Sequence, residues 1–438
     1  MGIDRRGRER RKNVLRTLGF VFERFGEHEL ANHAAAGAYA FLLSATPALL
    51  LVVGLATSLF SAWPEARDAL FEITTEVFEG LPASGPASGP LVDFFSRRLG
   101  LGAALFALVS LVWAARLFIL TVQRGLRVVW GVSPLEKPVR DNLVTFGLEF
   151  AALVLVVLVL TGAEAFRFLL GFTPEFMSET VRAVSVTLLR SLPPLLLFLY
   201  AYFTYLLIPP RGPRRSTAAL AALLCVVVYA SFSIVLDFAI NRSHYDLLYG
   251  VFGGLVAVLL RVWAFFTVYF HCAEFAFILD NYDALLFSRF LDVSRRQDAG
   301  RIARSLYARP ARILRRYGKR VAAGELIFRE GDQGREAYYL LEGTVGIYLG
   351  EGGVERRVST IGEGELFGEI AELIAEGRSA TARAETELEV VVLPPELLRN
   401  LIDTDSRTAR RLIDLLSRRL KEANIRLFSE GAMSPREP

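Results

Sequence analysis

The chain has 438 residues, enough for two or three domains, and its formal net charge of +4 is too small to indicate a nucleic-acid partner. Hydrophobic residues make up 53% of it and the mean hydropathy is +0.38, both high for a soluble globular protein, so the composition favours membrane insertion. The two cysteines, Cys225 and Cys272, lie inside apolar runs, which excludes a disulfide framework.

Six apolar runs are each long enough to cross a hydrocarbon core of about 30 Å, which takes about 20 helical residues. They cover approximately 35–60, 100–122, 142–163, 184–208, 217–240 and 251–279. Pro47 in the first run and Pro193-Pro194 in the fourth each remove a backbone hydrogen bond. We therefore expect those two helices to be kinked or broken.

Basic residues gather in alternate connections between these runs. Lys and Arg are dense in the leader, between the second and third runs, between the fourth and fifth, and after the sixth from Arg295 to Arg320. The connection 61–98 is instead mainly acidic. Because Lys and Arg are retained on the cytoplasmic side of a membrane, this alternation predicts a multi-pass protein with both termini in the cytoplasm.

Charged side chains inside the predicted spans are candidates for function, since each costs about 2.5–3.5 kcal/mol at the bilayer centre. These membrane polar candidates are Arg116, Glu149, Asp237, Arg261 and Glu274. Arg261 shares a helical face with Gly250 and Gly254, so a neighbouring helix can approach it and bring Glu149 or Asp237 alongside. That arrangement would form a polar pathway or an ion-pair gate, or equally a structural pair that fixes helix register. For Asp237 and Glu274, near the span ends, snorkelling to the interface is the simpler explanation.

Two segments of the membrane half carry a family resemblance. The first span contains His33-Ala-Ala-Ala-Gly-Ala-Tyr, and the last is preceded by Tyr249-Gly250 and contains Ala273-Glu274. Over residues 15–290 the chain resembles the YihY/BrkB family of bacterial inner-membrane proteins, although Cys272 replaces the family's usual glycine. The resemblance implies a six-span inner-membrane domain and transport of an unknown substrate.

From about Val321 the pattern changes to short β-type runs separated by glycine turns, such as Glu330-Gly331-Asp332 and Glu342-Gly343. Short strands at this spacing indicate an antiparallel sandwich or jelly roll. The predicted fold is therefore multi-domain: an α-helical six-span membrane bundle at 1–290, a basic linker at 291–320, and a cytoplasmic antiparallel β jelly roll with flanking helices at 321–430.

Inside the predicted roll lies a sequence suited to binding a phosphate next to a ribose. Gly368 lets backbone approach an anion, and a short helix is expected to start just after it. Arg378 can form a forked, charge-assisted pair with a phosphate, and Glu369 can accept from a ribose 2′-hydroxyl. The predicted ligand-binding residues are Phe367, Gly368, Glu369, Ile370, Arg378, Ser379 and Ala380.

This stretch closely resembles the cyclic-nucleotide-binding domains of catabolite activators and protein kinase regulatory subunits, over about 318–428. The resemblance implies cyclic AMP or cyclic GMP as a regulatory ligand, although some domains of this type bind nothing. Glu372 departs from the family's usual apolar residue, and Ala375-Glu376-Gly377 replaces a common Gly-Gly-Pro. No residue that we can identify selects the base.

A final helix near 405–428 has apolar residues in alternating steps of four and three. It is expected either to pair two subunits into a homo-oligomer or to pack on its own roll. Because the sequence stops at Pro438, we expect no DNA-binding module after it. His28-Glu29 and His33 are one residue too far apart for a His-Glu-x-x-His zinc site. Because the sequence also shows no nucleophile–base or metal constellation, we expect no metal and no enzyme activity.

Two functions remain. The first is an integral inner-membrane protein, transporter- or channel-like, whose activity is regulated by a cytoplasmic cyclic nucleotide. The second is a membrane-anchored cyclic nucleotide sensor or scaffold without transport activity. The sequence leaves the substrate, the nucleotide, the direction of regulation and the oligomeric state open.

Overall fold

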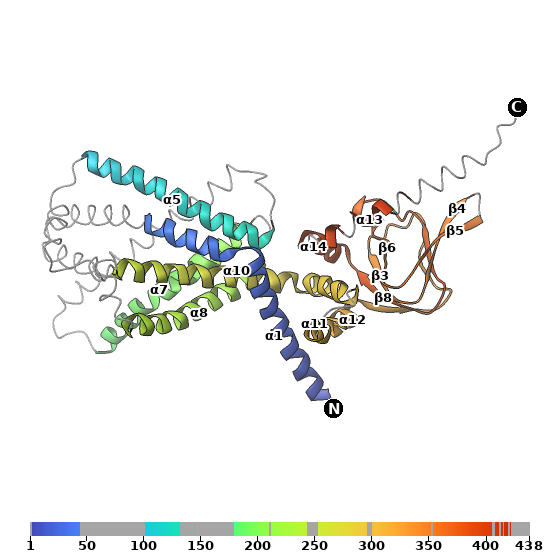
Figure 1. Ribbon diagram of the computed structural model, residues 1–438, viewed down its shortest axis with the longest axis horizontal. Helices are drawn as coiled ribbons and strands as arrows, with labels where there is room; N and C mark the ends of the chain where they lie inside the picture. The colour runs from blue at the N-terminus through green and yellow to red at the C-terminus, as the bar shows by residue number, and fades with distance from the viewer. Residues whose placement is uncertain are drawn as a thin grey trace. The chain divides into compact units, whose positions relative to one another are not determined.

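In the computed structural model (Figure 1), the described residues are 2–43, 101–131, 147, 179–209, 212–242, 253–295, 300–351 and 354–404, with further positions between 408 and 421. They fall into two compact units. We call Thr17–Asp280 the helical unit, and Met1–Arg16 together with Asn281–Pro438 the sheet unit.

The helical unit contains only helices in the ranges that the structure describes. These are the second part of α1 (Gly2–Glu27), from Thr17 onward, a helix over residues 30–43, α5 (Leu101–Trp130), α7 (Glu179–Leu207), α8 (Arg215–Arg242) and most of α10 (Gly253–Arg295). Helices α7 and α8 lie side by side (Figure 1). The expected apolar helices are therefore found at α5, α7, α8 and α10. The predicted spans at 142–163 and most of 35–60 lie outside the described residues, so the number six stays a prediction.

Two stretches of described helix are long and apolar enough to cross a membrane. They are Arg215–Leu236, with a mean hydropathy of 2.6, and Val256–Ser294, with 1.7. Large apolar side chains on α8 are exposed, as expected for a helix that faces lipid: Leu220, Leu223, Val227, Ile234, Val235 and Phe238. A shorter apolar helix covers Ser191–Leu207.

Helix α7 continues through Pro193 and Pro194. It is therefore not broken at these residues, although a proline pair was expected to kink or break it. Each proline removes one backbone N–H, and apolar membrane helices tolerate this where their neighbours satisfy the freed carbonyls. Pro47 lies outside the described residues.

Helix α10 is the longest described helix, with 43 residues and a single non-helical residue, Asn281 (φ −109°, ψ 17°). Just before this residue, Asp280 accepts hydrogen bonds from the Arg214 backbone N–H and the Thr217 hydroxyl, both at 2.8 Å. These contacts satisfy donors at the start of α8, where backbone N–H groups lack helical partners. A carboxylate of α10 thus anchors the first turn of α8.

The described residues of the sheet unit form eight short strands. They are β1 (Gly318–Val321), β2 (Leu326–Phe328), β3 (Ala337–Glu342), β4 (Val345–Glu351), β5 (Val354–Ile361), β6 (Leu366–Phe367), β7 (Thr381–Ala384) and β8 (Leu388–Leu393). They form two four-stranded antiparallel sheets, in the orders β1-β8-β3-β6 and β2-β7-β4-β5. The predicted antiparallel sheet structure is confirmed, and its description as a jelly roll stays a prediction.

The core of the sheet unit comes from apolar residues of the strands. In β8, the residues Leu388, Val390, Val391 and Leu393 are all buried. Of these, Leu388 and Val390 join Leu340, Val345, Phe367 and Ala382 from four other strands in one apolar cluster. Gly343 links β3 to β4 at φ +103°, where a Cβ atom would lie 2.5 Å from the Glu387 carbonyl oxygen. Glycine at this turn therefore lets the connection from β3 to β4, which passes from one sheet to the other, lie close to the β7–β8 connection.

Short helices flank the strands within 300–351 and 354–404. They are α11 (Arg301–Tyr307), α12 (Ala311–Tyr317), α13 (Ile370–Leu373) and α14 (Pro395–Thr404). Pro310 separates α11 from α12. The apolar positions of the predicted final helix run from Ala409 to Leu427, and the later ones lie outside the described residues.

The last part of α10 is attached to the sheets through α12 and β3. The Asp283 carboxylate accepts from Arg312 at 2.6 Å, from Arg316 at 2.9 Å and from the Tyr317 hydroxyl at 3.2 Å. The rings of Phe287 and Phe290 meet Tyr339 of β3 edge-on, with centroids 5.6 and 6.0 Å apart. These contacts fix α10 after Asn281 to the sheet unit.

Candidate functional site

The predicted ligand-binding residues come from two segments, one at each end of α13. Phe367 ends β6, Gly368 and Glu369 follow, and Ile370 begins α13. Arg378, Ser379 and Ala380 directly precede β7. The two segments meet where Arg378 Nη1 donates to the Gly368 carbonyl oxygen at 2.7 Å. The structure therefore brings the glycine and the arginine together.

Gly368 has to be a glycine for two separate reasons. Its φ of +75° lies in the left-handed region that a Cβ disfavours. A Cβ atom would also lie 2.8 Å from Arg378 Nη1 and 3.2 Å from the ring of Phe328. The bare backbone at this position is what allows the guanidinium to approach.

The Arg378 backbone is fixed by the turn between β2 and β3. The Gly331 N–H donates to the Arg378 carbonyl oxygen at 2.8 Å, and the Arg378 N–H donates to the Asp332 carbonyl oxygen at 2.9 Å. The residue is 3% exposed, and its Nε has no hydrogen-bond partner among the described residues. A buried guanidinium with an N–H still to satisfy is a donor suited to an anionic oxygen.

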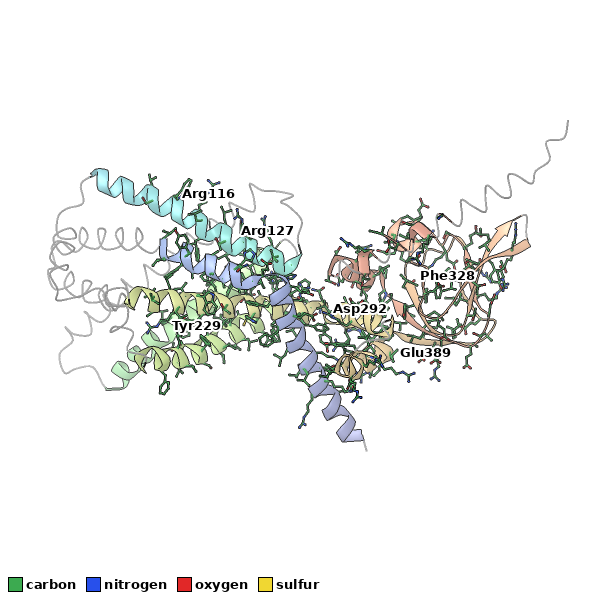
Figure 2. All side chains as sticks on the ribbon, viewed as in Figure 1. Arg116, Arg127, Tyr229, Asp292, Phe328 and Glu389 are labelled. Atoms are coloured by element: carbon green, nitrogen blue, oxygen red, sulfur yellow. The ribbon has the colours of Figure 1, made fainter. Side chains whose placement is uncertain are left out.

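Aromatic rings line one side of this guanidinium. Its carbon lies 4.2 Å from the centroid of Phe328 and 5.8 Å from that of Tyr338. Tyr338 stacks on Phe367 with centroids 5.2 Å apart, and Phe328 lies among the strands of the sheet unit (Figure 2). The ring faces attract the positive charge and help to fix the plane of the guanidinium.

Burial lowers the pKa of the Arg378 guanidinium from its ordinary value, and the nearby Tyr338, Glu336, Asp332 and Glu369 oppose this change. Burial also raises the pKa of the Tyr338 hydroxyl, against the effect of the Arg378 charge. Arginine keeps its proton at any physiological pH, so the group presents a permanent positive charge with little water around it.

Glu336 was not anticipated as part of the site. One of its carboxylate oxygens lies 3.4 Å from Arg378 Nη2, and its side chain is 46% exposed. This carboxylate stands beside the guanidinium that was predicted to pair with a phosphate. Phe328 and Tyr338 were also missed, because a ring that stacks on an arginine has the same sequence signature as an ordinary core residue.

The remaining predicted residues differ in burial. Glu369 is completely buried at the N-cap of α13, Phe367 is 1% exposed, and Ile370 and Ala380 are half-buried. Ser379 is exposed. The site thus presents a buried cation on one side of Gly368 and a buried carboxylate directly after it. That pairing suits a ligand that carries an anionic group next to a hydroxyl.

Glu372, which departs from the family's usual apolar residue, has a specific partner. Its side chain is 2% exposed and accepts from Arg399 Nε of α14 at 2.5 Å, whereas the arginine is 61% exposed. The position therefore carries an ion pair that joins α13 to α14.

The membrane polar candidates that the structure describes lie on several helices and differ in exposure. Arg116 is exposed on α5, which also carries Arg127 (Figure 2). Arg261 is half-buried on α10, and Asp237 belongs to α8. Glu149 lies outside the described residues, so its expected pairing with Arg261 stays a prediction.

Glu274 is buried within the helical unit, at 0% exposure, so it does not snorkel to an interface. Its Oε2 accepts from Arg24 Nε at 2.8 Å, and its Oε1 lies 2.6 Å from His28 Nδ1. Arg24 also donates to the Val129 carbonyl oxygen and covers the Phe277 ring at 4.2 Å. The partners of Glu274 thus come from α1 and the turn after it, about 250 residues earlier in the chain.

Among the described residues, no group of three or more His, Cys, Asp or Glu side chains is placed to hold a metal ion. Both cysteines are buried and free.

Comparison with known proteins separates the chain into two parts. The model of the family described as virulence factor BrkB matches residues 21–288, and that of the cyclic nucleotide-binding domain matches residues 318–405. A UPF0761 membrane protein of Chromohalobacter salexigens is 27% identical over 58% of this chain and 60% of its own length.

The second part has relatives of a different kind. The cyclic AMP receptor protein of Thermus thermophilus is 39% identical over 24% of this chain and 49% of its own length. The crystal structure of the catabolite activator protein of Thermus thermophilus is 36% identical, covers 26% of this chain and 54% of its own, and has a TM-score of 0.25. The chain thus spans at most about three fifths of the length of the relatives described here.

Proposed function

Since this chain belongs to the virulence factor BrkB family through residues 21–288 and carries a cyclic nucleotide-binding domain at 318–405, we propose that it is a membrane protein regulated by a cyclic nucleotide. The nucleotide binds in the sheet unit and shifts the helical unit between two states. We propose that the helical unit has a transporter- or channel-like activity. The proposal includes no enzyme activity and no bound metal.

The observation that carries the proposal is the position of Arg378. Its buried guanidinium donates to the Gly368 carbonyl oxygen, lies over Phe328 and has an Nε with no hydrogen-bond partner among the described residues. Glu369 is fully buried next to the same glycine. In a cyclic nucleotide the phosphate closes onto the ribose, so the phosphate oxygens and the 2′-hydroxyl lie side by side. Arg378 would hold the phosphate, and Glu369 would accept from the hydroxyl.

We further propose a bacterial inner-membrane location with six spans and both termini in the cytoplasm, and a jelly-roll fold for the sheet unit. The alternation of basic and acidic connections supports this topology, and the apolar helices α7, α8 and α10 support the spans. The domain at 318–405 would then face the cytoplasm, where cyclic AMP and cyclic GMP are made. The final helix could join two subunits.

A ligand shifts a two-state equilibrium only by the difference between its affinities for the two states. A typical coupling of about 1–3 kcal/mol changes the active population about 5- to 150-fold. Helix α10 begins in the helical unit and ends in the sheet unit. It is therefore the first candidate for the element that couples nucleotide binding to the state of the helical unit.

The first test is calorimetric titration of the full chain in nanodiscs with cyclic AMP and with cyclic GMP. We expect Arg378→Ala to weaken binding about 100-fold, which corresponds to losing two charge-assisted hydrogen bonds of about 1.5 kcal/mol each. Glu369→Gln should weaken it too. Arg383→Ala is the matched control. Arg383 lies in β7 directly before a core residue, and its side chain pairs with Glu355 at 2.8 Å, away from Gly368. Equal binding by Arg378→Ala and wild type would refute the site.

The second test asks whether the nucleotide changes the transport activity proposed for the helical unit. Proteoliposomes are given a step in external potassium chloride or glycerol, and their volume change is followed by light scattering with and without saturating nucleotide. A nucleotide-dependent rate that is absent in Arg378→Ala supports regulated transport. Binding without any such change would instead favour a membrane-anchored sensor or scaffold.

A further inference from the structure

Helix α1 belongs to both units. Its residues up to Arg16 are part of the sheet unit, and from Thr17 onward it is part of the helical unit. The basic leader therefore has contacts of its own with the sheet unit, in addition to the role in membrane topology that its charge predicts.

Arg16 is the main attachment of this first part of α1. Its side chain is 1% exposed, which places it among the most deeply buried large side chains of the described residues. Both Nε and Nη2 donate to the Leu306 carbonyl oxygen, Nε at 2.9 Å, and Nη1 donates to Asn13 Oδ1 at 2.9 Å. A buried charge is costly unless it is paired or hydrogen-bonded, so this arrangement fixes Arg16 to the end of α11.

Lys12 makes a second contact of the same kind. Its Nζ donates to the Ser305 carbonyl oxygen at 3.3 Å. Lys12 and Arg16 are four residues apart, so they lie on one face of α1. Ser305 and Leu306 are in the last turn of α11, where carbonyl groups lack helical partners and the helix dipole favours a cation. Two cations of α1 thus cap the C-terminal end of α11.

A third contact joins α1 to α10. The Tyr282 hydroxyl, on the residue after Asn281, donates to Asn13 Oδ1 at 3.3 Å. The face of α1 that carries Lys12, Asn13 and Arg16 therefore contacts both α11 and the first turn of α10 in the sheet unit.

Beyond Arg16, α1 continues as one helix to Glu27. Within the helical unit the same helix carries Arg24, which pairs with the buried Glu274 at 2.8 Å. Helix α1 thus carries one arginine that contacts the sheet unit, the buried Arg16, and a second, Arg24, that pairs within the helical unit.

We propose that α1 is a second coupling helix, which carries the nucleotide-bound state of the sheet unit to the Arg24–Glu274 pair through its Lys12 and Arg16 contacts with α11. This inference rests on the proposed regulation by a cyclic nucleotide. It adds a route through the N-terminal helix to the route through α10.

The test is amide hydrogen exchange of the full chain in nanodiscs, with and without saturating cyclic AMP, followed by mass spectrometry. The readout is the nucleotide-induced change in exchange of peptides that cover residues 17–27. We expect wild type to show such a change, and Arg16→Gln to reduce it by about threefold or more while the cyclic AMP affinity stays within about twofold. Arg11→Gln is the matched control, because Arg11 is an exposed basic residue on the same helix and its loss should leave the change intact.

Because Arg16 is buried, Arg16→Gln could fail to fold, and Lys12→Gln is the second variant. Lys12 is partly exposed and makes one long hydrogen bond, so this variant should fold and lose part of the change. A full wild-type change in folded Arg16→Gln, or in Lys12→Gln if Arg16→Gln does not fold, would overturn the inference. So would wild-type protein that binds cyclic AMP without any change in residues 17–27. Absence of binding by wild type would instead refute the proposed function itself.

Discussion

The guanidinium carbon of Arg378 lies 4.2 Å from the centroid of the Phe328 ring. This contact orients the one side chain on which nucleotide binding is proposed to depend. Phe328→Leu keeps an apolar side chain of similar reach but removes the ring, at a cost of about 1 kcal/mol. We expect the cyclic nucleotide affinity to fall about fivefold, measured by calorimetry. Tyr348→Leu, which removes the ring under Arg383 at 5.3 Å, is the matched control and should leave affinity unchanged.

Glu336 lies 3.4 Å from Arg378 Nη2 and is partly exposed, so its attraction is screened by solvent. Its negative charge repels an incoming phosphate and competes with it for the guanidinium. Glu336→Gln should therefore raise cyclic nucleotide affinity by about two- to fivefold at low salt, and less at high salt. Glu342→Gln, at the far end of β3, should have no effect. A loss of affinity in Glu336→Gln would show that the carboxylate positions Arg378 for binding.

Ala375, in the loop that leads to Arg378, is exposed and has a φ of +56°. A Cβ in this left-handed region costs about 1 kcal/mol, which glycine avoids, although glycine adds entropy to the unfolded chain. We expect Ala375→Gly to raise the stability of the sheet unit by about 0.5 kcal/mol. Thermal unfolding followed by circular dichroism would measure it. Ala322→Gly, at an exposed position without positive φ, should instead lower stability.

Alkaline pH should destabilise the sheet unit through Tyr338. Burial raises the pKa of its hydroxyl above the ordinary value of about 10. Below that value both the folded and the unfolded state hold the proton, so the contribution to stability is complete. Above it the unfolded state loses the proton first, and stability falls as pH rises through the folded-state pKa.

Tyr338→Phe should therefore flatten the decline in unfolding midpoint between about pH 9 and 11. It should also remove one late-titrating group from the near-ultraviolet phenolate absorbance. An unchanged decline in this variant would assign the loss of stability at alkaline pH to other groups. Tyr317 is the next to test, because burial also raises the pKa of its hydroxyl.

Glu274→Gln tests the buried pair of the helical unit. The substitution leaves Arg24, which is only 11% exposed, without a negative partner. Breaking a buried pair in this way costs about 3–5 kcal/mol. We expect a clear loss of thermal stability in detergent. Glu23→Gln, at an exposed position one residue before Arg24, is the control and should change stability little.

The nucleotide site was largely visible in the sequence because its main residues are close together along the chain. Gly368 and Arg378 are ten residues apart, and their types carry chemistry that few other roles require. The strands were predictable for a similar reason, since glycine turns bound several of the short β-type runs. Glu336 and Phe328 escaped notice because they lie about 40 to 50 residues before Arg378 and have unremarkable neighbours.

The helical unit was harder to predict. Apolar runs indicate that helices are present, but they do not determine which charged side chains meet. Glu274 was interpreted as a residue near a span end, whereas its partners Arg24 and His28 come from the basic leader. Likewise, the arginines of the leader were explained by membrane topology, yet Arg16 is buried against α11. Contacts between residues about 250 or more positions apart leave no local pattern in one sequence.

The ion pair between Glu372 and Arg399 has a consequence for the conditions under which the sheet unit works. An apolar contact between α13 and α14 would hold equally well in dilute and concentrated salt. Here the link depends on an arginine that is 61% exposed, so ions in the surrounding solution weaken it. We therefore expect the strength of this one link between α13 and α14 to fall as the ionic strength rises, independently of the nucleotide concentration.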